Sequence, residues 1–281
     1  MSSVSKSHDR RIPVLARKDS LRMLAPGAPV AQVTKVRSVI AVPAAKVQCS
    51  SCNLRAGCLP AGLTRDELEH MDRRLVAVRR KVAHGETLFR TGDRFDALFA
   101  IWTGFFKSVV TTSQGREQVT GFQMAGELIG LGGIDTGRHE VDAVALENSQ
   151  VCVVPFTELE ALGREVPRLQ RQLHRIMSHQ IAFNHNVMLL LGSMYAEERV
   201  AAFLLDLTHR LQARGYSAST VLLRMSREEI GSFLGLTLET VSRALSKLQS
   251  SGQLSVQQRQ IRINDPAALQ QLIDRAQVRR E

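Results

Sequence analysis

The sequence has little cysteine and no long apolar run, and both absences exclude classes of protein. Four cysteines in 281 residues are too few for a scaffold held together by disulfides. No stretch approaches about 18 uninterrupted apolar residues, and no apolar segment follows the early basic residues, so neither a membrane span nor a secretory signal is predicted. We therefore expect a cytoplasmic protein without membrane contact, whose cysteines act as ligands or as redox groups.

Signatures of catalysis are also missing. The chain contains no G-x-S-x-G, P-loop, G-x-G-x-x-G or H-E-x-x-H motif. Its eight histidines are scattered, and His174, His179 and His185 fall on a predicted helix, where exposed polar residues are the ordinary explanation. An enzyme is not expected.

Charge is distributed unevenly along the chain. Lysine and arginine number 37 against 27 aspartates and glutamates, a net charge of +10. Residues 1–48 carry +7, residues 49–195 are neutral, and residues 196–281 carry +3. A basic surface attracts polyanions such as nucleic acid, although a charge excess that only aids solubility is the alternative.

The composition divides the chain into four segments and predicts an α+β fold. Residues 1–48 are rich in Ser, Ala, Pro and basic residues, which is typical of a disordered tail. Residues 49–165 combine a cysteine-containing loop with a β-roll domain. Residues 166–195 form a long helix, and residues 196–281 form a separate C-terminal domain.

The β-roll is indicated by short apolar runs that alternate with glycine-containing turns from about residue 75 to residue 155. The segments 97–102 and 105–110 are strand-like, and strands repeated at about 8–12-residue spacing are typical of a sandwich or roll. Upstream, Thr64 and Glu67 form a capping box that begins a short helix over residues 63–72.

The long helix is predicted over residues 167–194. Its apolar positions repeat every seven residues from Leu169, with Gln180 included, which is typical of a coiled-coil seam between two protomers. The alternative is a helix that lies against its own domain. Glutamate at Ile176 or Val187 is expected to abolish the homodimer. The predicted dimer-interface residues are Leu173, Ile176, Phe183, Val187, Leu190 and Met194.

The C-terminal domain carries the pattern of a helix-turn-helix. Ser226 and Glu229 form a second capping box, Gly235 ends that helix, and Thr237 caps the next one, which Gly252 stops. Two helices joined by a tight glycine-containing turn are typical of DNA-binding proteins, although helical hairpins also occur in ordinary α-domains.

The second of these helices has one apolar face and one polar face. Glu239, Ser242 and Arg243 lie on the polar face near its start, where a recognition helix enters the major groove. Arginine pairs with guanine, glutamate accepts from the cytosine amino group, and serine contacts a base or a phosphate. The runs 254–256 and 261–263 predict a hairpin after it, hence a winged helix-turn-helix.

The cysteines are clustered in the sequence. Cys49, Cys52 and Cys58 give a C-x2-C-x5-C pattern, and Cys152 lies in the predicted last strand of the roll. Thiolates at such spacing can converge on zinc or on an iron–sulfur cluster, and the spacing does not separate the two. Cys152 completes a set of four only if the fold brings the loop to it.

These motifs together resemble the Crp–Fnr transcription regulators, and within them the FNR branch of oxygen-responsive regulators. The resemblance covers about residues 49–270. The segments that carry it are Cys49-x2-Cys52-x5-Cys58, Gly85-Glu-Thr-Leu-Phe89, Gln118-Val-Thr-Gly-Phe122, Cys152-Val-Val-Pro-Phe156, Ala196-Glu-Glu-Arg-Val-Ala-Ala-Phe203 and Ile230-Gly-Ser-Phe-Leu-Gly-Leu-Thr-Leu-Glu-Thr-Val-Ser-Arg243.

The resemblance implies a fold and a mechanism. It implies a cyclic-nucleotide-binding-like β-roll as the sensor, a dimerisation helix and a winged helix-turn-helix. It implies a 4Fe–4S cluster on the four cysteines that favours a homodimer bound to a palindromic operator of double-stranded DNA with TTGAT-like half-sites. Glu239, Ser242 and Arg243 match the base-reading positions. Oxygen is expected to destroy the cluster and release the DNA, and the bound protein to contact RNA polymerase.

One departure and two alternatives accompany the resemblance. Many relatives carry an acidic residue on the dimer helix near Asn184, so we expect dimerisation here to depend less on the cluster. A cyclic-nucleotide-dependent regulator is one alternative, since Gly126-Glu127-Leu128 resembles part of a phosphate cassette; however, His139-Glu140 stands where an Arg-Ser pair is expected. A zinc-bound or thiol-redox regulator is the other.

Overall fold

Glycine-punctuated strands of the N-terminal half pair into two antiparallel sheets of four strands each in the computed structural model, which describes residues 48–75, 78–112 and 114–278. All of these residues belong to the second of the chain's two units, Val42–Glu281. The predicted disordered tail at 1–48 lies, apart from residue 48, outside the described residues.

The two sheets face each other across an apolar core and form a β-roll. One sheet has the order β1-β8-β3-β6 and the other the order β2-β7-β4-β5. Both contribute to a cluster of buried side chains that includes Phe99, Phe106 and Val151. Gly104 turns β3 into β4 at a φ of 99°, and a Cβ there would lie 2.0 Å from the Ser149 hydroxyl, so only glycine fits. The strands are β1 (Val78–Val82), β2 (Thr87–Phe89), β3 (Ala97–Thr103), β4 (Phe105–Thr111), β5 (Glu117–Met124), β6 (Leu128–Ile129), β7 (Asp142–Ala145) and β8 (Ser149–Pro155).

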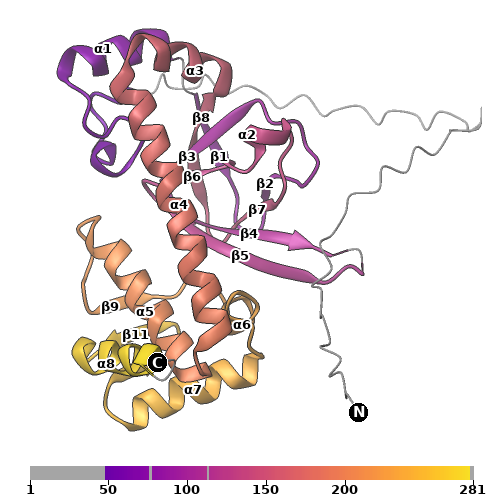
Figure 1. Ribbon diagram of the computed structural model, residues 1–281, viewed down its shortest axis with the longest axis vertical. Coiled ribbons are helices and arrows are strands. Elements are labelled where there is room, and N and C mark those ends of the chain that lie inside the picture. The colour runs from indigo at the N-terminus through magenta and orange to yellow at the C-terminus, as the bar shows by residue number, and fades with distance from the viewer. Residues whose placement is uncertain (1–47, 76–77, 113, 279–281) are drawn as a thin grey trace, which may run out of the picture. The chain divides into compact units, whose positions relative to one another are not determined.

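Helices cover the outer face of the β1-β8-β3-β6 sheet (Figure 1). These are α1 (Arg65–Arg74), α3 (Phe156–Glu165) and the N-terminal part of α4 (Pro167–Ser193); a short α2 (Gly133–Thr136) lies within the roll. Leu98 from the sheet, Leu159 from α3 and Leu169 from α4 pack together there. The capping box of α1 on Thr64 is confirmed, although the helix begins and ends two residues later than predicted.

The 27-residue helix α4 is present as predicted, and it has two different apolar faces. The six predicted interface residues are partly buried against the chain's own cores: Leu173 and Ile176 pack on the sensor side, and Phe183, Val187, Leu190 and Met194 on the C-terminal side. Ile181 and Met188, in contrast, are 57% and 61% exposed. Leu190 follows Ile181 by nine residues, about half a turn away around the helix. As a dimer contact the six residues remain a prediction, and the exposed apolar face is the opposite one.

The C-terminal domain packs helices on a three-stranded sheet of order β10-β11-β9. The hairpin predicted at 254–256 and 261–263 is confirmed, and β9 adds a strand that the sequence pattern did not indicate. Its elements are α5 (Ala196–Gln212), β9 (Thr220–Leu222), α6 (Arg227–Leu234), α7 (Leu238–Ser250), β10 (Leu254–Gln257), β11 (Gln260–Ile263) and α8 (Pro266–Val278).

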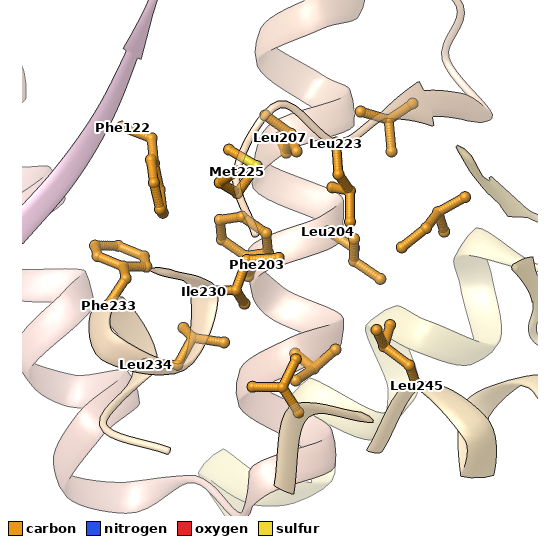
Figure 2. Packing of buried hydrophobic residues seen from close by; sticks show 14 of the residues in the cluster. Phe122, Phe203, Leu204, Leu207, Leu223, Met225, Ile230, Phe233, Leu234 and Leu245 are labelled. Atoms are coloured by element: carbon orange, nitrogen blue, oxygen red, sulfur yellow. The ribbon is translucent and has the colours of Figure 1, made fainter. Parts of the chain in front are cut away.

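One apolar core joins this domain to the roll. Phe122 of β5 lies edge-on to Phe203 of α5 and Phe233 of α6, with ring centroids 5.9 and 5.5 Å apart (Figure 2). Leu204 and Met225 continue the same cluster. The expected β-roll, long helix and winged helix-turn-helix are thus confirmed. In the described part of the chain, none of the helices has both the length and the hydropathy that a membrane span requires.

Candidate functional site

The cysteine loop has little regular structure of its own. Among its residues only Arg55–Gly57 form a 3-10 helix, and the rest is a series of turns. The Cys52 amide donates to the Cys49 carbonyl at 3.2 Å, and the Arg55 amide donates to the Cys52 carbonyl at 3.3 Å. Such a loop needs contacts from elsewhere to hold its sulfurs in place.

Asp72 of α1 supplies part of that anchorage. Its carboxylate accepts hydrogen bonds from the Cys49 amide at 2.6 Å, from the Ser50 amide at 3.1 Å and from the Ser50 hydroxyl at 2.5 Å. Bonds to an ionised acceptor are stronger than bonds between neutral groups. The predicted α1 helix therefore fixes the first cysteine, a role that its sequence alone does not reveal.

The fold brings all four cysteines together. Cys49 is close enough to Cys52, Cys58 and Cys152 for their charges to raise its pKa. Cys58 is affected in the same way by Cys52 and Cys152, and Cys152 by Cys52. Each of the six pairs therefore interacts, and the condition that the sequence set for Cys152 as fourth member is met.

The environment raises the pKa of Cys49, Cys58 and Cys152, which favours the protonated form of these three thiols. Burial, followed by the neighbouring thiolates and Asp72, raises the pKa of Cys49 to about 12. Burial also raises the pKa of Cys58 to about 12, against the hydrogen bond of the Leu59 amide. Burial raises the pKa of Cys152, while the hydrogen bond and positive charge of Arg79 lower it. A bound metal would displace these protons, because the thiolate is the ligand.

The spacing of the sulfurs bears on what they can hold. A tetrahedral zinc with bonds of about 2.3 Å draws its sulfurs into near contact. Within residues 48–75, 78–112 and 114–278, no group of three or more His, Cys, Asp or Glu side chains is arranged to hold a metal ion. A 4Fe–4S cluster takes one cysteine at each of four irons, so four thiols are a suitable donor set for a cluster as well as for zinc.

The cysteine loop also contacts the long helix. The side-chain amide of Gln172, one of the buried residues of α4, donates to the Cys58 carbonyl at 3.4 Å. Leu173 and Ile176, one and four residues further along α4, share an apolar cluster with Cys49, Cys58 and Cys152. The cysteine loop and the N-terminal half of α4 are therefore in direct contact.

A second candidate site lies on α7. Thr237 accepts a hydrogen bond from the Thr240 amide at 3.2 Å and begins the helix, and Gly235 ends α6 in the left-handed region at a φ of 63°. The capping box of Ser226 and Glu229 is confirmed. Local side-chain bonds therefore fix the angle at which α7 is presented.

The three predicted base-reading residues lie on the outer face of α7. Glu239 and Arg243 are exposed, whereas Ser242 is half-buried and accepts from the Arg227 guanidinium at 3.2 Å. The amide at the helix start, the Thr237 hydroxyl and the charge of Arg243 lower the pKa of Glu239, so its carboxylate is ionised. The face offers an acceptor and a bidentate donor one helical turn apart, a combination that suits base edges.

The wing, formed by β10 and β11, follows α7 in the chain. Its turn contains Gln258, the one non-glycine residue of positive φ (56°) in the described part of the chain, followed by Arg259. Arg259 and Arg262 are both exposed. They add positive charge to the wing, and contacts to phosphates are what position a reading helix on DNA.

Comparison with known proteins assigns both halves of the chain. A model of the cyclic nucleotide-binding domain matches residues 79–165, and a model of the Crp-like helix-turn-helix domain matches residues 198–272. The transcriptional activator protein Anr of Pseudomonas aeruginosa is 42% identical over 240 residues, which cover 85% of this chain and 96% of that protein. The chain belongs to the Crp–Fnr family of transcription regulators.

Further relatives place it in the FNR branch of that family. The fumarate and nitrate reduction regulatory protein of Escherichia coli K12 is 41% identical over 80% of this chain and 90% of its own length. The solved structure of FixK2 from Bradyrhizobium japonicum is 34% identical, covers 70% of this chain and 98% of its own, and superposes with a TM-score of 0.65. As a Crp–Fnr member the chain is a DNA-binding transcription regulator and not an enzyme.

Aromatic side chains surround His139, which stands where the resemblance to Crp-type proteins places an arginine. His139 is buried and stacks on Phe89 with ring centroids 3.7 Å apart, and Phe95 lies edge-on to it at 5.5 Å. Burial lowers the pKa of His139, so the ring is neutral at physiological pH. A neutral imidazole does not replace a guanidinium for a phosphate diester.

The sequence alone did not reveal the residues that join the β-roll and α4 to the C-terminal domain. Glu127, part of the cassette-like motif, instead pairs with Arg210 and Arg214, each at 2.7 Å. Arg199 donates to the carbonyls of Leu191 at 2.7 Å and Leu234 at 2.9 Å, so it ties the end of α4 to α6. Except for Leu191 and Arg199, these partners are far apart in sequence, and no local pattern marks them.

Proposed function

We propose that this FNR-type regulator responds to oxygen through a 4Fe–4S cluster held by Cys49, Cys52, Cys58 and Cys152. The observation that carries the proposal is the mutual proximity of the four thiols. The identity to Anr and to the fumarate and nitrate reduction regulator supports it. When bound, such a cluster supplies a centre that oxygen can oxidise and dismantle.

The residues of the chain couple this site to dimerisation. Gln172 holds the Cys58 carbonyl, and Leu173 and Ile176 pack with the cysteines, so an ordered loop supports the N-terminal half of α4. When the cluster is lost, the cysteine loop keeps its hydrogen bonds to Asp72 but loses its packing against α4. A small change in the packing of α4 is sufficient to shift the monomer–dimer equilibrium, because the free energies of the two states need differ by only a few kcal/mol.

We propose that a second copy of the chain covers the exposed face of α4. Regulators of this family are typically dimeric, and Ile181 and Met188 are seven residues apart, the spacing of a helix–helix seam. The six residues predicted as the interface line the inner faces of the same helix. They would keep α4 aligned in each protomer while Ile181 and Met188 make the contact.

The dimer would present two copies of α7 to a palindromic operator with TTGAT-like half-sites. Glu239, Ser242 and Arg243 are proposed to read base edges, and the wing arginines Arg259 and Arg262 to contact phosphates. Reading both half-sites requires both protomers, so loss of the dimer removes most of the specific affinity. The bound dimer would then recruit or block RNA polymerase according to the position of the site.

Anaerobic purification of the full-length protein tests this proposal. The account expects iron and acid-labile sulfide in equal amounts, broad visible absorption that disappears in air, and loss of specific DNA binding at the same time. A zinc-bound or thiol-redox regulator is the alternative, and it predicts colourless protein.

A further inference from the structure

A guanidinium lies beside the cysteine site, on the sheet that carries Cys152. Arg79 of β1 is the direct cross-strand partner of Cys152 of β8, and Ala100 of β3 is opposite Cys152 on its other side. Directly opposed residues of antiparallel strands project from the same face. The Cζ of Arg79 lies 3.6 Å from the ring centroid of Trp102, and the positive charge of the guanidinium lowers the pKa of Cys152.

The donors of Arg79 are not all used. Its Nε is buried and lacks a hydrogen-bond partner among the described residues, one of two such side-chain atoms there. A buried charged donor that stays unpaired is costly, and such groups call for an explanation such as an absent ion or ligand. An anionic group on the four sulfurs would provide an acceptor at this place.

The next residue in the chain shows what an arginine with an ordinary structural role does. Arg80 projects from the other face of β1, donates to the Leu88 carbonyl at 3.1 Å and pairs with Glu86 at 3.3 Å. Both of its contacts lie within the roll, and neither involves a cysteine. Two adjacent arginines on one strand therefore differ in a way that an experiment can use.

We propose that Arg79, held flat on Trp102, is a positioning residue of the cysteine site: it donates to the sulfur of Cys152 and to the anionic centre held there, and so sets how easily that centre is oxidised. This inference rests on the proposed function. A hydrogen bond and a positive charge at a thiolate stabilise the more reduced, more negative state, and outer-sphere partners tune a centre almost as strongly as its ligands.

The test compares four variants of the full-length protein after anaerobic reconstitution: Arg79→Gln, Arg79→Lys, Trp102→Leu and the matched control Arg80→Gln. The readouts are iron and sulfide per chain, the midpoint potential of the centre in an anaerobic titration, and the rate at which visible absorption is lost in air. Arg79→Gln should shift the potential to more negative values and speed the loss about 10-fold. Arg79→Lys, which keeps the charge, should recover part of both, and Arg80→Gln should match the parent protein.

Trp102→Leu tests the same idea without removing the arginine, and it covers the case in which Arg79→Gln folds poorly. It is expected to shift the potential in the same direction by less. The inference is overturned if Arg79→Gln and Trp102→Leu retain the potential and air sensitivity of Arg80→Gln in protein that carries its full iron and sulfide. Parent protein that takes up no iron and sulfide would instead refute the proposed function, and the role of Arg79 with it.

Discussion

The DNA-reading helix and the cysteine loop obtain their geometry in different ways. Glu239 and Arg243 lie one turn apart on a helix whose start and preceding turn are fixed by residues within the same short segment. The four cysteines, in contrast, come from two segments about a hundred positions apart, and the loop that carries three of them has a single 3-10 turn. One site is built locally, and the other depends on distant partners.

This difference indicates where regulation can act. A recognition helix with its own caps and a buried inner face keeps its shape whether or not the sensor is loaded. A loop built from short turns, without a long helix or a strand, belongs to the parts of a protein that open at low cost. Loss of the cluster is therefore expected to act through α4 and to change how the two DNA-binding domains are paired. Each DNA-binding domain is expected to stay folded.

The largest effect is expected from Cys58→Ser. Loss of one sulfur should prevent cluster assembly and abolish specific DNA binding under anaerobic conditions. The circular dichroism of the protein should stay unchanged, because Cys58 lies outside the helices and strands of the fold. Iron content and binding to an operator duplex provide the measurements. Ser51→Ala, in the same loop, is the matched control. Full DNA binding by iron-free Cys58→Ser would contradict the coupling between the cysteine site and the DNA-reading helix.

Glutamate on the exposed face of α4 should come next. Ile181→Glu and Met188→Glu place a charge where a second protomer is proposed to pack, and specific affinity should fall by about 100-fold or more as the dimer is lost. Sedimentation equilibrium of anaerobic protein measures this. Asn186→Glu, about 140° away around the helix from Ile181, is the control. Dimers that persist in both variants would contradict this interface and favour the inner residues of α4, such as Val187, as the dimer contact.

Arg243→Ala sharpens the comparison at the reading head. Removal of a bidentate donor to guanine is expected to weaken operator binding by roughly 1–3 kcal/mol and to leave dimerisation unchanged. The comparison is between an operator duplex and a scrambled one. Arg259→Ala on the wing should weaken both duplexes alike, and an unaltered preference in Arg243→Ala would remove this residue from base reading.

Asp72→Asn is expected to loosen the cysteine loop without removing a ligand. The carboxylate accepts three hydrogen bonds from Cys49 and Ser50, and loss of its charge should cost about 1.5 kcal/mol or more. Cluster loss in air should be faster and the melting temperature a few degrees lower. Glu69→Gln, on the same helix but exposed, is a suitable control, and an Asp72→Asn protein with the parent's air sensitivity would show that the loop needs no such anchor.

The smallest effect is expected from Asn184→Asp. Asn184 is exposed on the outer side of α4 and accepts from the Gln180 amide at 3.0 Å. Two carboxylates facing each other across a dimer would repel, by roughly 0.2–1 kcal/mol for solvated charges. Cluster-free parent protein should retain more dimer than cluster-free Asn184→Asp in sedimentation runs. Equal dissociation of the two would contradict the idea that the missing carboxylate matters.

Local signals explain which parts of the fold were predictable. Capping at Thr64, Ser226 and Thr237 fixes helix starts through contacts three residues apart, so sequence suffices. The strands on either side of Gly104 are predictable for the same reason, since two apolar runs flank a single glycine turn. The inner face of α4 was harder to interpret, since a seven-residue repeat looks the same whether the partner is a second helix or the chain's own two cores.

The candidate sites divide in the same manner. The four cysteines and the α7 face follow from residue type and spacing, and the family resemblance sharpened both. Asp72, Arg79 and Arg199 could not be found this way, because their partners lie in other segments and only the folded chain brings them together. Charged residues on a helix or an outer strand are ordinarily solvated, so the sequence pattern does not indicate that these residues have specific partners.

The central claim is that four sulfurs hold a labile iron–sulfur centre that governs pairing of the protomers. Its most direct test is the iron and acid-labile sulfide content of anaerobically purified protein, followed through exposure to air together with sedimentation. The account predicts about four irons and four sulfides per chain, lost in air together with the dimer. One zinc per chain, or a dimer whose DNA binding is indifferent to air, would contradict it.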